Sequence, residues 1–425
     1  MTHSPPLFGV MATDGEDEPR SMLTAGVSAT SRLLRRPLAS YYLVLGSAGL
    51  LLTLGLFMVF SASSVYSLRE HGSSYYIVTR QLAWALAALP VAFVVSRMSP
   101  RTIRRLGMPL MVVSIALLLL TYVPGLGEEV RGNRNWIDFG GPFRVQPSEL
   151  AKLGLVLWGA DVLARSGKSL RQWKQLVVPF APVALIAVGL TVGQGDLGTA
   201  VVLMGVVLTL LWVVGVPSWL FGLAVGTAGV IGVYFVMAAE HRMDRVRLFL
   251  DPFADVDNRT FQAAHSIYAF SNGGWWGRGL GGSIEKWGGL PEAHTDFIFA
   301  IIGEELGLPG TFMVIALFLV LGYAGVRIAW NTRDPFVRLT AAGITGGFLL
   351  QALLNMGSVL AVLPIVGVPL PLVSYGGSAL MPMLVAVAVL VAFAKHQPGA
   401  QAALAARRGS RDAGAPRRER GGVSV

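Results

Sequence analysis

The 425-residue sequence contains no cysteine and is poor in charged residues. Without cysteine, the chain can form no disulfide, no thiol nucleophile and no cysteine-ligated metal site. Charged residues make up 14% of the chain, against about a quarter in soluble proteins, whereas hydrophobic residues make up 53% and the mean hydropathy is +0.60. These proportions exclude an ordinary soluble enzyme and indicate an integral membrane protein.

The apolar residues fall in blocks close to the length of about 20 residues that crosses a bilayer as a helix. The block 297–328 is too long for one simple crossing. Because Pro309 is favoured in the first turn of a helix, we expect residues 309–330 to span and residues 297–308 to form a half-helix or interfacial segment beside a protein cavity. We predict an all-α polytopic membrane protein with about ten transmembrane helices, at roughly 38–60, 76–96, 106–124, 148–165, 175–193, 197–215, 218–239, 297–328, 340–362 and 374–395.

Basic residues follow alternate apolar blocks, which predicts the orientation of the spans. By the positive-inside rule, both termini are cytoplasmic and the large loop 240–296, between spans 7 and 8, is extracytoplasmic. The first block is too long for the core of a signal peptide. We predict disordered cytoplasmic tails at 1–37 and 397–425, the second one basic, around one transmembrane domain at 38–396. The net charge of +10 does not indicate nucleic-acid binding, because no separate basic domain exists.

The loop 240–296 is the longest polar interval and is rich in glycine and arginine. A loop of this length without evident secondary structure is usually functional or disordered, and its tryptophans argue against disorder. Arg245 and Lys286 belong to a basic set that suits an anionic ligand, above all a phosphate group. A solvated basic surface is the alternative. The tryptophans suit sugar stacking and interfacial anchoring equally well.

His294, Thr295 and Asp296 close this loop at the edge of an apolar run. Thr295 or Asp296 is a reasonable helix N-cap, and a carboxylate at the water–lipid boundary also suits a general base. Glu304 and Glu305 follow inside the apolar run, where acids usually face a cavity or a partner. Since Glu304 lies roughly 12 Å along a helix from Asp296, we expect pairing with a cation there rather than shared chemistry.

Ser148 and Glu149 open the fourth span as a helix N-cap and a first-turn acid. Glu149 and Lys152 are three residues apart and can pair on one helix face. Lys152 lies one turn inside an apolar run, which indicates a functional or pairing role. Asp196 follows a turn on the outer side. It is either a helix cap or, with Asp296, one of two carboxylates able to hold a divalent cation.

Five segments of the chain resemble the SEDS family of polytopic membrane proteins and follow one another in the family's order. They are PSELAKL at 147–153, GDLGT at 195–199, FQAAHSIYAFSNGGWWGRGLGGS at 261–283, LPEAHTDFIFAIIGEELG at 290–307 and LPLVSYGGSAL at 370–380. The resemblance covers residues 38–395 and leaves out both tails.

The resemblance implies roles for single residues within these segments. Asp296 matches the family's essential aspartate, Lys152 its membrane-buried lysine and Asp196 its turn aspartate, although Gly195 stands where the family often has proline. With Arg245 and Lys286, which lie outside the matching segments and are selected for their charge, the substrate-binding candidates are Lys152, Asp196, Arg245, Gln262, Lys286, His294 and Thr295. The structural or pairing candidates are Ser148, Glu149, Glu304, Glu305, Ser374 and Tyr375.

The implied activity is that of a peptidoglycan glycosyltransferase, which polymerises lipid II at the outer face of the plasma membrane. Asp296 would act as the general base. The implied partners are a class B penicillin-binding protein and other divisome membrane proteins, at the division septum. A divalent cation, Mg²⁺ or Mn²⁺, is left open as a cofactor. The alternatives are a lipid II flippase or transporter, a non-catalytic scaffold, and an elongation-type polymerase of the same family.

Overall fold

The computed structural model of the protein describes residues 37–130, 133–138, 144–165, 173–237, 243, 249, 251–256, 260–397 and 399–403. Almost all of both predicted tails, 1–37 and 397–425, lies outside these ranges, and their disorder stays a prediction. Arg245 also lies outside the described residues.

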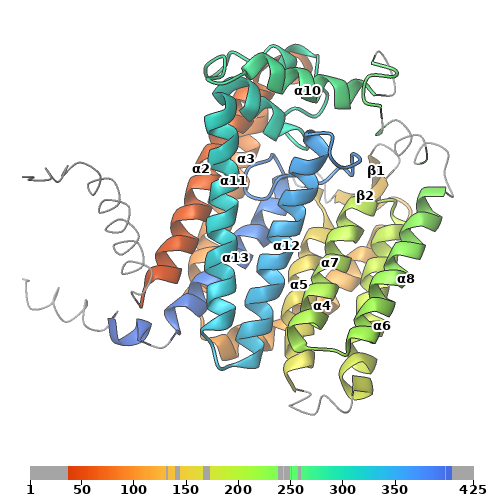
Figure 1. Ribbon diagram of the computed structural model, residues 1–425, viewed down its shortest axis with the longest axis vertical. Coiled ribbons are helices and arrows are strands. Elements are labelled where there is room, and N and C mark those ends of the chain that lie inside the picture. Colours follow the sequence, from red (N-terminus) through yellow and green to blue (C-terminus); the bar gives the residue numbers. More distant parts are fainter. Residues whose placement is uncertain are drawn as a thin grey trace, which may run out of the picture.

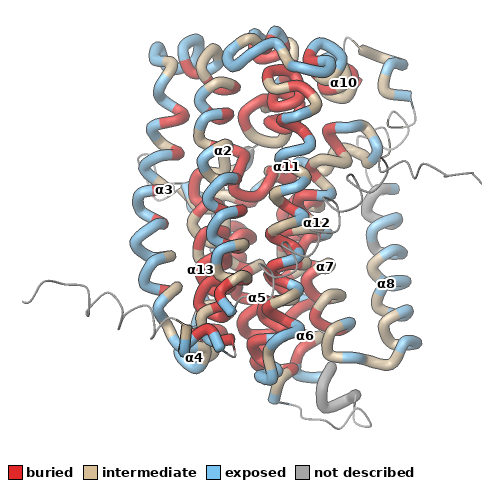
Figure 2. Tube along the Cα trace, turned by 60° about the vertical axis from the view of Figure 1, so that its left-hand side comes forward, coloured by how far each residue is buried: buried red, intermediate tan, exposed pale blue. Residues whose placement is uncertain are grey.

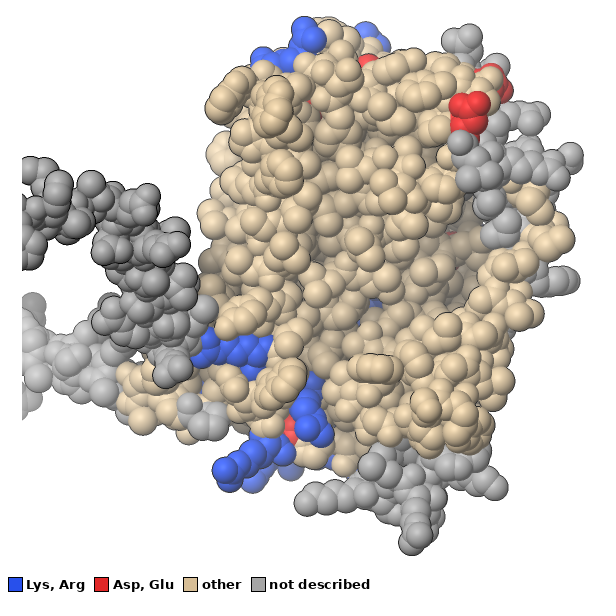
Figure 3. Space-filling model, viewed as in Figure 1, with Lys and Arg blue, Asp and Glu red and all other residues tan. Residues whose placement is uncertain are grey.

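Ten helices of 16 residues or more run side by side through the described part of the chain (Figure 1). Each of the ten predicted spans overlaps one of them, so the all-α polytopic membrane architecture is confirmed. Charged side chains gather towards the two ends of the molecule, and the middle of the face in Figure 3 is almost free of them. The helices are α2 (Ala39–His71), α3 (Tyr76–Val95), α4 (Pro100–Leu120), α5 (Pro147–Arg165), α6 (Trp173–Gly193), α7 (Leu197–Val214), α8 (Ser218–Met237), α11 (Ile298–Trp330), α12 (Pro335–Val359) and α13 (Leu380–Lys395).

Two helices, α2 and α11, are longer than a bilayer requires. Each has 33 residues, or about 50 Å at 1.5 Å per residue, against a hydrocarbon core of about 30 Å. The helix that overlaps the first predicted span continues past the predicted end of that span near Phe60, until Gly72 ends it in a left-handed conformation (φ 70°). The extra turns of α2 rise on the outer side and reach the loop before α11.

The long apolar run that forms α11 is broken, as the sequence predicted, but at Gly307 rather than at Pro309. Gly307 has φ 66° and ψ −160°, which separates an outer half-helix from the spanning helix that follows. Every residue from Ile298 to Glu305 is buried. The half-helix is covered by protein, with α10 (Phe261–Gly273) packed against it, rather than lying at the lipid interface.

The outer end of the bundle carries secondary structure that the sequence patterns did not reveal. Loop 125–147 contains a small antiparallel sheet of β1 (Gly127–Val130), β2 (Asn133–Asp138) and β3 (Arg144–Val145), in which Ile137 pairs with Gly127 and Val145. Loop 240–296 contains α10 and a short 3-10 helix, η2 (Glu285–Trp287). The expectation of a long loop without its own structure was wrong, because this segment caps the outer ends of α2 and α11 (Figure 1).

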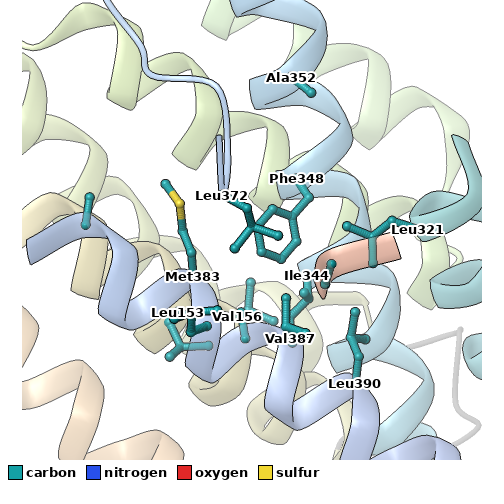
Figure 4. Packing of buried hydrophobic residues seen from close by; sticks show 14 of the residues in the cluster. Leu153, Val156, Leu321, Ile344, Phe348, Ala352, Leu372, Met383, Val387 and Leu390 are labelled. Atoms are coloured by element: carbon teal, nitrogen blue, oxygen red, sulfur yellow. The ribbon is translucent and has the colours of Figure 1, made fainter. Parts of the chain in front are cut away.

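The core lies between α5, α12 and α13, with side chains from α11 and the segment before α13 (Figure 4). Within the membrane-spanning stretch of α13, 83% of the residues are buried, against 28% for α3. Figure 2 shows α8 at the edge of the bundle, with most of its described surface exposed. Because α13 is central, the segments between α12 and α13 lie at the outer end of the bundle, where the candidate active site is found.

Candidate active site

A pocket of about 800 Å³ opens at the outer end of the bundle. Residues far apart in the sequence form its walls: the outer ends of α2, α3, α7 and α10, the sheet, the turn before α11, and the segments 364–369 and 375–377. Its polar and aromatic lining includes Tyr66, His71, Tyr76, Arg80, Trp84, Asn135, Trp136, Arg144, Gln146, Asp196, Gln262, Glu292, His294, Thr295, Asp296 and Tyr375. It brings together the predicted catalytic residue, Asp296, and four of the predicted substrate-binding residues, Asp196, Gln262, His294 and Thr295.

Asp296 lies on a tight turn between η2 and α11. Glu292 adopts a positive φ of 59°, and its backbone carbonyl accepts hydrogen bonds from the N–H groups of Thr295 (3.1 Å) and Phe297 (3.2 Å). The Thr295 hydroxyl donates to the Glu292 carboxylate at 2.5 Å. Because α11 begins at Ile298 with Phe297 at the N-cap, the predicted capping by Thr295 or Asp296 was wrong. The turn instead presents the half-buried Asp296 to the pocket.

The segment 364–369 lies directly against the Asp296 side chain. Gly367 has φ +67°, and a Cβ added to it would lie 3.7 Å from Asp296 Oδ2. On the other side of the turn, Asn355 of α12 donates a hydrogen bond of 2.7 Å to the Asp296 backbone carbonyl. Asp296 therefore contacts two separate parts of the chain, one through its side chain and one through its backbone carbonyl.

Two arginines that the sequence analysis did not select, Arg80 of α3 and Arg144 of β3, line the same pocket. Arg144 pairs with Glu128 at 2.9 Å, and its side chain is 48% exposed. Burial raises the pKa of the Tyr375 phenol above its usual value, although the guanidinium groups of Arg80 and Arg144 act in the opposite direction. Tyr375, which we expected to be structural, is therefore a protonated hydrogen-bond donor in the pocket. The sequence did contain a signal for Arg80, because Arg80 is the only charged residue in the apolar block 76–96.

Asp196 caps α7 and joins three elements. Its Oδ1 accepts from the Thr199 N–H at 3.0 Å, and its Oδ2 accepts from Thr199 Oγ1 (2.9 Å), Asn135 Nδ2 (2.9 Å) and Gln146 Nε2 (3.1 Å). The capping prediction is confirmed. These donors occupy the oxygens that a cation would need, and no group of three or more His, Asp or Glu side chains suited to a metal occurs among the described residues. The described residues around Asp196 therefore do not fit the divalent cation that the sequence left open.

An aromatic wall surrounds His294, which is 8% exposed. Its ring stacks on Tyr66 with centroids 5.3 Å apart and lies 5.8 Å from the ring of Tyr375. The His294 carbonyl accepts from the Tyr375 N–H at 2.9 Å. Ser374 is structural, as predicted, because its hydroxyl accepts from the Leu370 N–H at 2.8 Å. Aromatic faces beside polar groups suit the binding of sugar rings.

Lys286 lies outside the pocket, contrary to its predicted role in substrate binding. Its ammonium group is buried and donates to Glu305 Oε1 (3.0 Å), the Gly281 carbonyl (2.7 Å) and Ser61 Oγ of α2 (3.2 Å). Glu305 thus pairs with a cation, as expected. Glu304 is fully buried and accepts from the Ser283 hydroxyl and, at 3.0 Å, from the N–H of Ile284. These contacts fasten the outer loop to α2 and the half-helix.

Lys152 also lies away from Asp296, beside a smaller cavity between α5, α7, α12 and α13. Its ammonium group donates to Glu149 Oε1 at 2.8 Å, which confirms the predicted pair, and to Gln351 Oε1 at 2.7 Å. Ser148 does not cap α5, because the helix already begins at Pro147, and its buried hydroxyl has no hydrogen-bond partner in the described structure. The placement of Lys152 supports a pairing role rather than substrate contact.

Known proteins of one family are similar to this chain in sequence and in fold. A family model described as a cell cycle protein, for FtsW, RodA and SpoVE, matches residues 41–398. The chain belongs to the FtsW/RodA/SpoVE family. The resemblance to SEDS proteins is thereby confirmed, over a range that covers the ten helices except for the first two residues of α2.

Members of the FtsW/RodA/SpoVE family with curated names are similar over most of their length. A probable peptidoglycan glycosyltransferase FtsW of Mycobacterium tuberculosis is 41% identical over 88% of this chain and 71% of the relative. Stage V sporulation protein E of Bacillus subtilis is 36% identical over 82% of this chain and 94% of the relative.

Solved structures of the family share the fold. A chain from a peptidoglycan synthase complex superimposes with a TM-score of 0.67 at 28% identity, covering 84% of this chain and 98% of the other. The rod shape determining protein RodA of Thermus thermophilus gives a TM-score of 0.60 at 27% identity, covering 84% and 97%. The membrane-embedded architecture is therefore that of the family.

Proposed function

We propose that this protein is a peptidoglycan glycosyltransferase that polymerises lipid II in its outer pocket, with Asp296 as the general base. The glycosyltransferase class agrees with the names of its relatives. The observation that carries the site assignment is that Asp296, Arg80 and Arg144 line one pocket together with an aromatic wall. A base, cationic groups for a diphosphate and stacking surfaces for sugars are the parts this reaction needs.

The reaction follows from the chemistry of the substrate. Asp296 takes the proton from the 4-hydroxyl of the acceptor sugar, and that oxygen attacks the anomeric carbon of the donor sugar. The bond from the anomeric carbon to the undecaprenyl diphosphate breaks, and the leaving diphosphate carries away the electron pair. Since an α-linked donor gives a β-linked product, a single displacement with one carboxylate suffices, by analogy with inverting glycosidases.

Among the described residues, Arg80 and Arg144 are the arginines placed to bind the diphosphate. Arginine forks bind phosphate oxygens in pairs, and preorganised positive charge stabilises the leaving group as its charge grows. The protonated Tyr375 phenol lies within reach of their fields and supplies a further hydrogen-bond donor. The diphosphate is thus expected to lie on the side of the pocket formed by α3 and β3.

The cellular role is division rather than elongation, at the septum. Relatives named FtsW, with 36–41% identity, support this assignment. The similar chain from a peptidoglycan synthase complex, in which polymerisation and crosslinking are coordinated, supports a class B penicillin-binding protein as the partner. The pocket opens at one end of the bundle, whereas a flippase or transporter is expected to hold its substrate near the membrane midplane.

The test is polymerisation of labelled lipid II by purified protein, with and without the transpeptidase partner. We expect Asp296→Asn to abolish glycan strands on a gel while the protein unfolds at the wild-type temperature. Asp251→Asn, which changes an exposed carboxylate of the same outer loop, is the matched control and should polymerise normally. Wild-type rates from folded Asp296→Asn would refute the assignment of the base.

A further inference from the structure

Three buried polar side chains form a row on one face of α12. Gln351, Asn355 and Ser358 are 4%, 2% and 5% exposed, and their spacing of four and three residues places them one above another on a helix. Each donates a hydrogen bond to a backbone carbonyl of the segment 364–369. Gln351 binds Pro369 (2.9 Å), Asn355 binds Val368 (2.8 Å) and Ser358 binds Pro364 (2.9 Å). The row therefore fixes the backbone that walls the pocket.

Asn355 differs from the other two because it also binds the catalytic turn. Its Nδ2 donates at 2.8 Å to the Val368 carbonyl and at 2.7 Å to the Asp296 carbonyl. Both partners are acceptors, so the nitrogen of the amide has to face them. One side chain thus ties the residue that carries the base to the segment whose Gly367 lies beside the Asp296 carboxylate.

The segment 364–369 is confined from the opposite side as well. Gly198 of α7 packs so closely that a Cβ there would lie 2.3 Å from the Val366 carbonyl oxygen. Gln351 is fixed in turn by Lys152, which donates to its Oε1 at 2.7 Å. The segment is therefore packed on one side and hydrogen-bonded on the other, and the Asn355 amide links it directly to Asp296.

We propose that Asn355 is a positioning residue, which holds the Asp296 turn at the height and orientation that proton transfer requires. Asn355 does not line the pocket, so it acts through Asp296 and not on the substrate. This inference rests on the proposed role of Asp296 as the base. Misplacement of a reacting group by about 1 Å can lower the rate by roughly 100-fold, which sets the size of the effect expected.

The experiment compares Asn355→Ala with the isosteric Asn355→Asp in lipid II polymerisation, with the partner present. Positioning predicts that both variants lose about 10- to 100-fold in kcat with KM nearly unchanged, and that the pH profile of kcat shifts because the surroundings of Asp296 change. Asn355→Asp keeps the volume but turns a donor into an acceptor that faces two carbonyls, so a space-filling role would predict that it retains activity. Thr345→Val, also on α12, removes a hydrogen bond to its own helix at Ala341 and keeps a branched side chain against Gly325 of α11, so it should behave as wild type.

Each outcome is decisive once thermal unfolding is recorded for every variant. Wild-type kcat and pH profile in folded Asn355→Ala would overturn the inference. Failure of both Asn355 variants to fold would also overturn it, in favour of a purely structural role. Asp296→Asn is assayed in parallel. Activity in that variant would refute the role of Asp296 as the base. An inactive Asp296→Asn beside a normal Asn355→Ala would refute only the positioning role of Asn355.

Discussion

Replacing Lys286 with methionine tests whether this lysine binds substrate or stabilises the fold. In the structure its side chain is 4% exposed and pairs with Glu305, which is fully buried. Methionine keeps most of the volume but leaves the Glu305 carboxylate without its cation. Removing one partner of a buried ion pair costs about 3–5 kcal/mol. We expect the lower end of this range, because the single hydroxyl proton of Ser61, whose Oγ lies 2.7 and 2.8 Å from the two Glu305 oxygens, is still donated to that carboxylate.

The assay is thermal or denaturant unfolding of the purified protein in detergent, followed by polymerisation kinetics of the folded fraction. Lys286→Met should unfold at lower temperature, and the double variant Lys286→Met/Glu305→Gln should recover part of the loss, since the uncompensated charge is gone. Glu305→Gln alone completes the double-mutant cycle. KM for lipid II should stay close to wild type in all folded variants. An unchanged unfolding temperature with a strongly raised KM would show that Lys286 is accessible to the substrate and binds it.

Two further predictions concern the walls of the pocket. Gly367→Ala should lower stability by about 1–2 kcal/mol, because the residue has φ +67°. It should also reduce polymerisation more than tenfold, because its methyl group would lie 3.7 Å from Asp296 Oδ2. A normal rate would show that the segment lies away from the reacting atoms. Asp196→Asn should lower the free energy of unfolding by about 1–3 kcal/mol, since an amide in place of the carboxylate leaves some of its four donors unmatched. If Asp196→Asn instead unfolded like wild type but lost activity that Mg²⁺ or Mn²⁺ restored, Asp196 would be a metal ligand.

The helices, and the ion pair between residues one helical turn apart, could be predicted from the sequence because their signals are local. Each span is a continuous apolar block, and Glu149 and Lys152 pair across one helical turn. The break in α11 was predicted within two residues because both Gly307 and Pro309 belong to the same short motif. Asp296 was found from a motif that remains contiguous in the folded protein.

The rest of the site depends on contacts between distant residues, which composition and spacing do not reveal. Lys286 resembled a free cation in a glycine-rich loop, and its burial arises from Glu305 and Ser61, the latter 225 residues earlier in the chain. Arg144 joins the pocket through a small sheet whose strands are too short to give a periodic pattern. Asn355 lies inside a helix where a buried amide is explained only by the two carbonyls it meets.

The row of polar side chains on α12 also has a consequence for biosynthesis. Chains are made and inserted from the N-terminus, yet Asp296 is held by Asn355, 59 residues later, and the pocket wall is fastened by bonds such as Gln81 to Ser374, 293 residues apart. A nascent chain that has already delivered its outer loop across the membrane still lacks both. We therefore expect the enzyme to become competent only when α12 and the segment before α13 have been inserted, and incomplete chains in the membrane to be inert towards the lipid substrate around them.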